Sequence, residues 1–97
     1  MLETEDIMQK VIITVVGKDS VGIIAKVCTF LAGRSINILD ISQTIVSGYF
    51  NMMMIADMAQ CSEDFESTGN ELEKLGHEIG VSIRIQREEI FDMMHRI

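Results

Sequence analysis

The stretch VIITVVGKDSVGI, residues 11–23, decides the fold that the sequence predicts. Its first part, residues 11–16, consists of β-branched side chains only, which is typical of a central strand buried on both faces. The next residues, 17–20, indicate a turn that runs into a helix. We expect Asp19 to cap that helix, because its carboxylate can accept from the free N–H groups of the first turn. The stretch therefore predicts a strand, a turn and a helix in direct succession.

The predicted helix carries a one-sided apolar stripe and ends at Gly33, which can adopt the left-handed conformation. The stripe consists of Ile23, Ile24, Val27, Phe30 and Leu31. A second strand is predicted over residues 36–46, where the apolar pattern changes phase between Ile38 and Leu39. A β-bulge would explain this change, and a misread start of the strand is an equal alternative.

The rest of the chain completes the element order. Ser47-Gly48 predicts a tight hairpin turn into a third strand over residues 49–58, and Ser62 is expected to begin a second helix. Residues 81–87 alternate between apolar and polar, as a fourth strand does. The order β-α-β-β-α-β predicts an α+β, ferredoxin-like sandwich, an antiparallel sheet with two helices on one face.

One domain fits a chain of 97 residues. We expect a lead-in over residues 1–10, the domain itself over residues 11–87, and a short amphipathic C-terminal helix over residues 88–97.

Composition excludes several classes of function. The net charge of −7, from 15 acidic and 8 basic residues, disfavours nucleic acid and anionic membrane surfaces as partners. Cys28 and Cys61 lie far apart without a CxxC motif, so no metal or redox site is predicted. The acidic N-terminus does not resemble a signal peptide, and no apolar run approaches the ~20 residues of a membrane helix. We therefore expect a cytoplasmic protein that has no cofactor.

The sequence shows no arrangement of residues that is typical of a catalytic site. His77 and His95 are the only histidines, and no spacing indicates a Ser-His-Asp or Cys-His arrangement. An acylphosphatase-like site needs an arginine in the loop after the first strand, whereas Arg34 follows the first helix. We expect no catalytic residues, and hence no enzyme.

Two motifs resemble the ACT-domain family. These are the pattern Gly-x-Asp-x-x-Gly-Ile at residues 17–23 and the Asn-Ile at residues 37–38, together with the βαββαβ order, and the resemblance covers residues 11–87. The chain is most similar to the stand-alone, single-domain members of this family, through residues 41–44, the methionine-rich third strand and the C-terminal tail. The resemblance implies a regulatory domain that binds an amino acid or another small effector between its first loop and a neighbouring subunit.

Two segments are the ligand-binding candidates that this resemblance implies. They are the first loop, with Asp19, Ser20, Val21, Gly22 and Ile23, and the start of the second strand, with Asn37, Ile38, Leu39 and Asp40. Free N–H groups at a helix start favour a carboxylate, and the amide of Asn37 can both donate and accept hydrogen bonds. Plain structural roles remain as alternatives, namely packing for Gly22, a turn for Asn37 and capping for Asp19.

The apolar content of 47% is high for so short a chain. Residues 52–54, three methionines, place apolar side chains on both faces of a sheet that has helices on one face only. We expect a homodimer, with its sheets side by side or face to face and the tail helix helping to seal it. The predicted function is small-effector binding by a regulatory dimer, with a regulated protein as a further partner. The alternative is a protein-interaction module without a small-molecule ligand.

Overall fold

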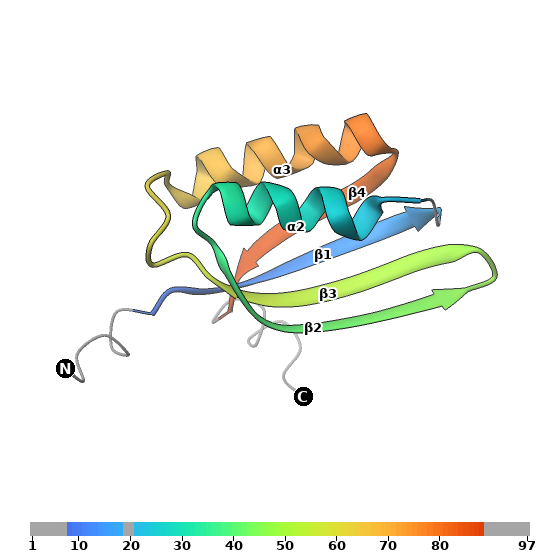
Figure 1. Cartoon of the computed structure of the whole chain (residues 1–97), viewed down its shortest axis with the longest axis horizontal. Coiled ribbons are helices and arrows are strands. Elements are labelled where there is room, and N and C mark those ends of the chain that lie inside the picture. The colour runs from blue at the N-terminus through green and yellow to red at the C-terminus, as the bar shows by residue number, and fades with distance from the viewer. Residues whose placement is uncertain (1–7, 19–20, 89–97) are drawn as a thin grey trace.

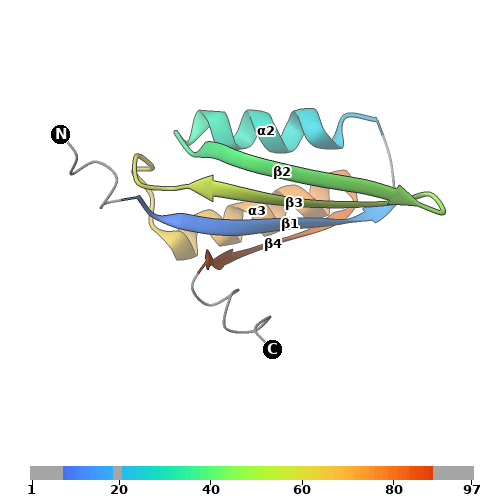
Figure 2. The same cartoon turned by 90° about the horizontal axis from the view of Figure 1, so that it is seen from below.

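The computed structural model describes residues 8–18 and 21–88. Along the chain, the elements are β1 (Lys10–Lys18), α2 (Ile23–Gly33), β2 (Asn37–Val46), β3 (Tyr49–Asp57), α3 (Phe65–Ile79) and β4 (Val81–Arg87). The strands form one antiparallel sheet in the order β2-β3-β1-β4, and α2 and α3 lie side by side on one of its faces (Figure 1). The turned view shows the same two layers from below (Figure 2). This arrangement confirms the predicted ferredoxin-like sandwich.

The core lies between the sheet and the two helices, and β1 supplies its centre. Val11, Ile13 and Val15 are almost completely buried on the helix-covered face. On the opposite face Ile12 is also buried, whereas Val16 is 46% exposed. The prediction that this strand is covered on both faces therefore holds for its first half only. The rest of the core comes from the other helices and strands and from the connections between them, and consists of Ile23, Val27, Leu31, Ile36, Phe50, Met52, Met54, Ala56, Met58, Leu72 and Ile83.

Two local irregularities follow the sequence as predicted. The register between β2 and β3 shifts between Ile38 and Asp40, so that Leu39 has no direct partner and forms a bulge. Ser47 and Gly48 have φ values of 53° and 80°, and positive φ at both central residues is the signature of a type I′ hairpin turn. The bulge and the hairpin are thus confirmed.

The ends of α2 differ from the prediction. The helix begins at Ile23, and its N-cap is Gly22, with φ of 89° and no side-chain cap hydrogen bond. Asp19, which lies outside the described residues, is therefore too early in the chain to be the N-cap. Gly33 is still helical, and Ser35 adopts the left-handed conformation instead, with φ of 60°.

The start of α3 also differs from the prediction. Asp64 is its N-cap, because the carboxylate of Asp64 accepts from the N–H of Ser67 at 2.7 Å. Ser62, the predicted cap, lies two residues too early. Several residues before this helix are good caps by type, and only the packed position of the helix decides which of them caps it.

Two predicted segments fall largely beyond the described residues. The expected helix over residues 88–97 is described only at Glu88, and the lead-in over residues 1–10 only at its last three residues, of which Lys10 already belongs to β1. Within residues 8–18 and 21–88, no helix is both long enough and apolar enough to cross a membrane.

Candidate ligand-binding site

The first half of the predicted site is the connection from β1 to α2. Asp19 and Ser20 lie outside the described residues. Val21 is fully exposed, and Gly22 is half-buried with a φ of +89°. Ile23 is buried in the core, so its side chain anchors α2 and does not face a ligand. Of the described residues in this segment, Val21 and Gly22 are the two that a ligand can reach.

The start of α2 offers backbone donors beside Gly22. The first N–H groups of a helix have no acceptor within the helix, and their dipoles favour an anion. The first turn of α2 contains no acidic side chain that would occupy them. Apart from Gly22 and its two chain neighbours, the nearest described atom to the position that a Cβ on Gly22 would take is the Cε of Lys26, at 4.0 Å. A small anionic group can therefore approach this backbone closely.

The second half of the predicted site is the beginning of β2. Asn37, Leu39 and Asp40 are exposed, whereas Ile38 is half-buried and packs against the core. The carboxylate of Asp40 accepts from the N–H of Ile41 at 2.9 Å. The bulge at Leu39 thus separates two polar side chains, Asn37 and Asp40, which both face solvent.

A single chain does not bring the two halves together. Asn37 pairs with Asp57, and Asp57 pairs with Lys10 at the beginning of β1. The first loop instead follows Lys18 at the end of β1, eight residues further along the strand. At about 3.3 Å per residue this is a separation of roughly 26 Å. The two segments therefore lie at opposite ends of the sheet (Figure 1).

The outer strand β2 has an apolar surface that the sequence reasoning missed. Ile41 and Ile45 pair with Met54 and Phe50, so their side chains lie on the helix-covered face. They nevertheless remain 43% and 58% exposed, and Val46 at the end of the strand is 62% exposed. The alternation of Ile41 and Ile45 was visible in the sequence. The edge position of the strand was not, because strand order depends on pairings between distant segments.

Arg34, which sequence analysis weighed as the arginine of an acylphosphatase-like site, has a structural role. Its Nε donates to the Oε1 of Glu71 at 2.9 Å, and its Nη2 donates to the same oxygen. Glu63 lies 4.0 Å away, and the guanidinium stacks 4.8 Å from the ring centre of Phe30. The hydrogen bond with Glu71 is the main cause that raises the pKa of Arg34 above its ordinary value. Arg34 therefore ties the end of α2 to α3.

Side chains that could ligate a metal do not gather in the described part of the chain. Among residues 8–18 and 21–88, no group of three or more His, Cys, Asp or Glu side chains is placed to hold an ion. Cys28 and Cys61 are half-buried free thiols, and the sulfur of Cys61 lies 3.9 Å from the hydroxyl of Thr68.

The chain is similar in sequence and in structure to several known proteins. Residues 9–86 match the ACT domain family. The chain is 63% identical to a UPF0237 protein of Bifidobacterium longum over 93% of its own length and 100% of the relative's. It is 50% identical to a UPF0237 protein of Listeria innocua over 91% and 99% of the two chains. Among solved structures, an ACT domain protein from Streptococcus pneumoniae is 44% identical, with a TM-score of 0.77 and coverage of 87% and 94%.

Proposed function

The chain belongs to the ACT domain family, and on that premise we propose that it is a regulatory module which binds a small effector, an amino acid, as a homodimer. ACT domains are regulatory rather than catalytic, commonly dimerise, and often bind small effectors such as amino acids. In the proposed dimer the chain itself carries out no chemistry and needs no cofactor or metal.

The observation that carries the proposal is that the two site halves lie at opposite ends of the sheet, while β2, which carries one of them, is an edge strand. If the β2 strands of two copies pair antiparallel about a two-fold axis, each strand runs end for end beside the other. Asn37 of the partner subunit then lies beside Val46, at the same end of the sheet as the first loop. At each end of the dimer, the two-fold symmetry thus brings together the first loop of one subunit and the start of β2 of the other, which lie apart within one chain.

The β2 edge is suited to this pairing. Among the described residues, no strand lies beside its outer N–H and C=O groups, because β2 is the first strand in the sheet order. Burial of the exposed parts of Ile41 and Ile45 in both copies contributes on the order of a few kcal/mol. The edge therefore supplies both a backbone ladder and an apolar contact.

The completed site has complementary groups for an α-amino acid. The carboxylate of the effector is held by the N–H groups at the start of α2 beside Gly22. Its ammonium group faces Asp40 and Asn37 of the partner subunit, a carboxylate and an amide that both accept hydrogen bonds. An effector that binds across the interface stabilises the dimer relative to the separate chains. The effector therefore shifts the equilibrium between these two states towards the dimer.

The effector is sought first by thermal shift with the common L-amino acids. A ligand at 100 times its Kd adds ~2.7 kcal/mol, which is a shift on the order of 10 °C for a domain of this size. Gly22→Glu should abolish the shift. The matched control is Gly80→Glu, because Gly80 also has a positive φ and open surroundings but lies between α3 and β4, at the opposite edge of the sheet from β2. A well-folded dimer that responds to no amino acid would contradict the proposal and favour the interaction module.

The two-subunit nature of the site is tested by mixing variants. Gly22→Glu and Asn37→Ala should each lack binding as homodimers. After subunit exchange at equal amounts, mixed dimers carry one intact site, so about a quarter of the original sites return. Mass spectrometry verifies that subunits have exchanged. If the mixed dimers then bind no effector, a site shared between subunits is rejected.

The interface itself is tested by sedimentation. Ile45→Asp should convert the dimer to monomers. Met53→Asp should not, because Met53 is 40% exposed, against 58% for Ile45, and lies on the face of the sheet away from the helices. Dissociation by Met53→Asp alone would place the interface on the open face and contradict pairing through β2.

A further inference from the structure

A groove of about 660 Å³ lies between α3 and β4, and we call it the α3–β4 groove. The helix and the strand are packed closely beneath it, because a Cβ on Gly76 would lie only 2.6 Å from the carbonyl oxygen of Val81. Apolar side chains of β4 form much of its lining, namely Val81, Ile83 and Ile85. The groove thus offers an apolar surface to a small molecule.

One end of the α3–β4 groove is already engaged within the chain. The ring of Phe65 lines this end, and the guanidinium of Arg87 stacks 4.3 Å from the ring centre. Glu66 is the next residue along α3. The part of the groove that remains for a ligand extends from there along α3 towards Gly76.

Close contacts set the level of α3 against β4. A Cβ on Gly76 would meet the side chain of Ile83 at 3.2 Å, and a Cβ on Gly69 would meet the side chain of Ile85 at 3.1 Å. The middle of the helix segment between the two glycines therefore lies beside the strand residue between the two isoleucines.

Two charges of opposite sign occupy this level of the groove. Glu73 lies between the two glycines and Arg84 between the two isoleucines, and both are exposed side chains that line the groove. Within residues 8–18 and 21–88, the ion pairs within 4.0 Å are those of Arg34 with Glu63 and Glu71. Neither charge at this level therefore has an ionic partner in the described part of the chain.

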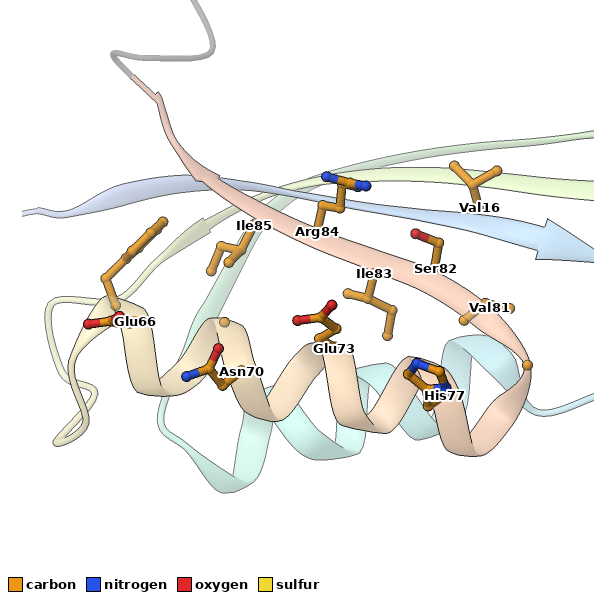
Figure 3. Close-up of a pocket in the computed structure, with 14 residues that line it drawn as sticks. Val16, Glu66, Asn70, Glu73, His77, Val81, Ser82, Ile83, Arg84 and Ile85 are labelled. Carbon is orange, nitrogen blue, oxygen red and sulfur yellow. The ribbon is translucent and has the colours of Figure 1, made fainter.

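The two charges come from different sides of the strand. Ile83 points towards α3, whereas Ser82 and Arg84 point to the face of β4 away from the helix, and Glu73 rises from α3 below them (Figure 3). All four side chains line the same groove, so the groove reaches around the outer side of β4 at this point. A ligand that meets both charges must carry its own charges well apart.

We propose that the α3–β4 groove binds a zwitterionic dipeptide, with its ammonium group at Glu73 and its carboxylate at Arg84. A guanidinium can hold a carboxylate through two parallel hydrogen bonds. Asn70, one turn before Glu73 on the same side of α3, and Ser82 offer donors and acceptors to the central amide. Apolar side chains of the peptide cover Ile83 and its neighbours in β4.

Other charge patterns suit the groove less well. A single α-amino acid carries both charges on one carbon, whereas an extended dipeptide spans about 7 Å. A ligand of one sign would pair with Glu73 or Arg84 and meet the other as a like charge. Glu66 lies seven residues before Glu73, about 10 Å along the helix, and His77 lies one turn after it. Neither is level with Arg84.

The proposed peptide site is independent of the effector site. The groups that hold the peptide belong to residues 70–84 of one chain, and β4 lies at the opposite edge of the sheet from β2. Peptide binding therefore requires neither the proposed dimer nor its effector.

The test uses the full-length protein and L-leucyl-L-leucine as the probe, with binding followed by amide chemical shifts in nuclear magnetic resonance. The N-acetyl form of the probe lacks the ammonium charge, and its C-terminal amide lacks the carboxylate charge. L-leucine carries both charges on one carbon. Each of the three should bind at least about tenfold more weakly than the probe, or about 1.4 kcal/mol. The shifts should lie along residues 70–77 and 81–84.

Single changes in the protein identify the partner of each end of the peptide. Glu73→Gln should weaken the probe about tenfold but leave the N-acetyl form unchanged, because the ammonium charge is already absent. Arg84→Gln should weaken the probe about tenfold but leave the amide unchanged. Glu78→Gln and Lys74→Gln are the matched controls, because both residues are exposed charges of α3 that do not line the groove. Each should change the affinity less than about twofold.

The proposal is supported if each loss depends on the matching charge of the ligand. It is overturned if the probe does not bind, if L-leucine or a charge-deleted form binds as well as the probe, if the control variants weaken binding equally, or if the shifts lie beside Gly22. Amino-acid binding at Gly22 has its own thermal-shift test, so either site can fail without the other. Unfolding curves of each variant confirm that the fold is intact.

Discussion

Replacement of Gly76 by alanine reverses an ordinary rule of helix stability. In an exposed helix interior, this change stabilises by ~1 kcal/mol, because glycine loses more backbone entropy on folding. In α3, however, the new Cβ would lie 2.6 Å from the carbonyl oxygen of Val81 and 3.3 Å from the N of Ile83. Both atoms belong to the backbone of β4 and cannot rotate away.

The magnitude follows from the two opposing effects. Overpacking costs ~1–3 kcal/mol, and a contact with fixed backbone belongs in the upper part of that range. After the helix gain of ~1 kcal/mol is subtracted, we expect a net loss of about 1–2 kcal/mol. For a domain of this size the melting temperature then falls by roughly 5–15 °C.

The assay is thermal and urea unfolding without effector, at several protein concentrations, because association also shifts apparent stability. Gly33→Ala is the control, since Gly33 is helical and, apart from its chain neighbours and the backbone of its own helix, no described atom lies within 4 Å of its Cβ position. That variant should gain up to ~1 kcal/mol. Gly69→Ala should fall between the two, because its new Cβ meets only the Cγ2 of Ile85 at 3.1 Å. If Gly76→Ala proves as stable as the unchanged protein while Gly33→Ala gains, the close approach of α3 to β4 is refuted.

Three further changes test the elements around the site. Asp64→Ala should lower the free energy of unfolding by ~0.5–2 kcal/mol, because the N–H of Ser67 loses its acceptor; no loss in urea unfolding would contradict the cap. Ile13→Ala should cost ~2–5 kcal/mol in the same assay, since Ile13 is fully buried at the centre of β1, and a loss below this range would argue against a tightly packed core. Ser47→Asn should raise the melting temperature by a few degrees, because asparagine before Gly48 tolerates the positive φ of a type I′ turn better than serine. A lower melting temperature would reject that turn type.

The features that the sequence determined by itself are those that depend on near neighbours. The β-branched run of residues 11–16 predicts a central strand, because adjacent side chains must then be buried on opposite faces of a sheet. A few consecutive residues likewise predict the hairpin at residues 47–48 and the bulge at Leu39. The bulge and the hairpin were confirmed, because the conformation needed at each point restricts which residue types can stand there. The strand was confirmed at the centre of the sheet, but its burial on both faces holds for its first half only.

The helix ends required the tertiary structure. Asp19, Ser62 and Asp64 are all capable N-caps by residue type. α2 nevertheless begins after Gly22, and α3 begins after Asp64. Where a helix starts is decided by how its buried stripe fits the sheet, and that fit overrides the preference of any single capping residue.

The candidate site depended on the tertiary structure most of all. Sequence analysis placed Asp19–Ile23 and Asn37–Asp40 in one site, yet strand pairing sets these segments at opposite ends of the sheet within one chain. The edge positions of β2 and β4 in the sheet were equally hidden, although the apolar pattern of each strand was visible in the sequence. Strand order arises from pairings between residues far apart in sequence, so only the assembled sheet decides which strands lie at its edges and what can bind there.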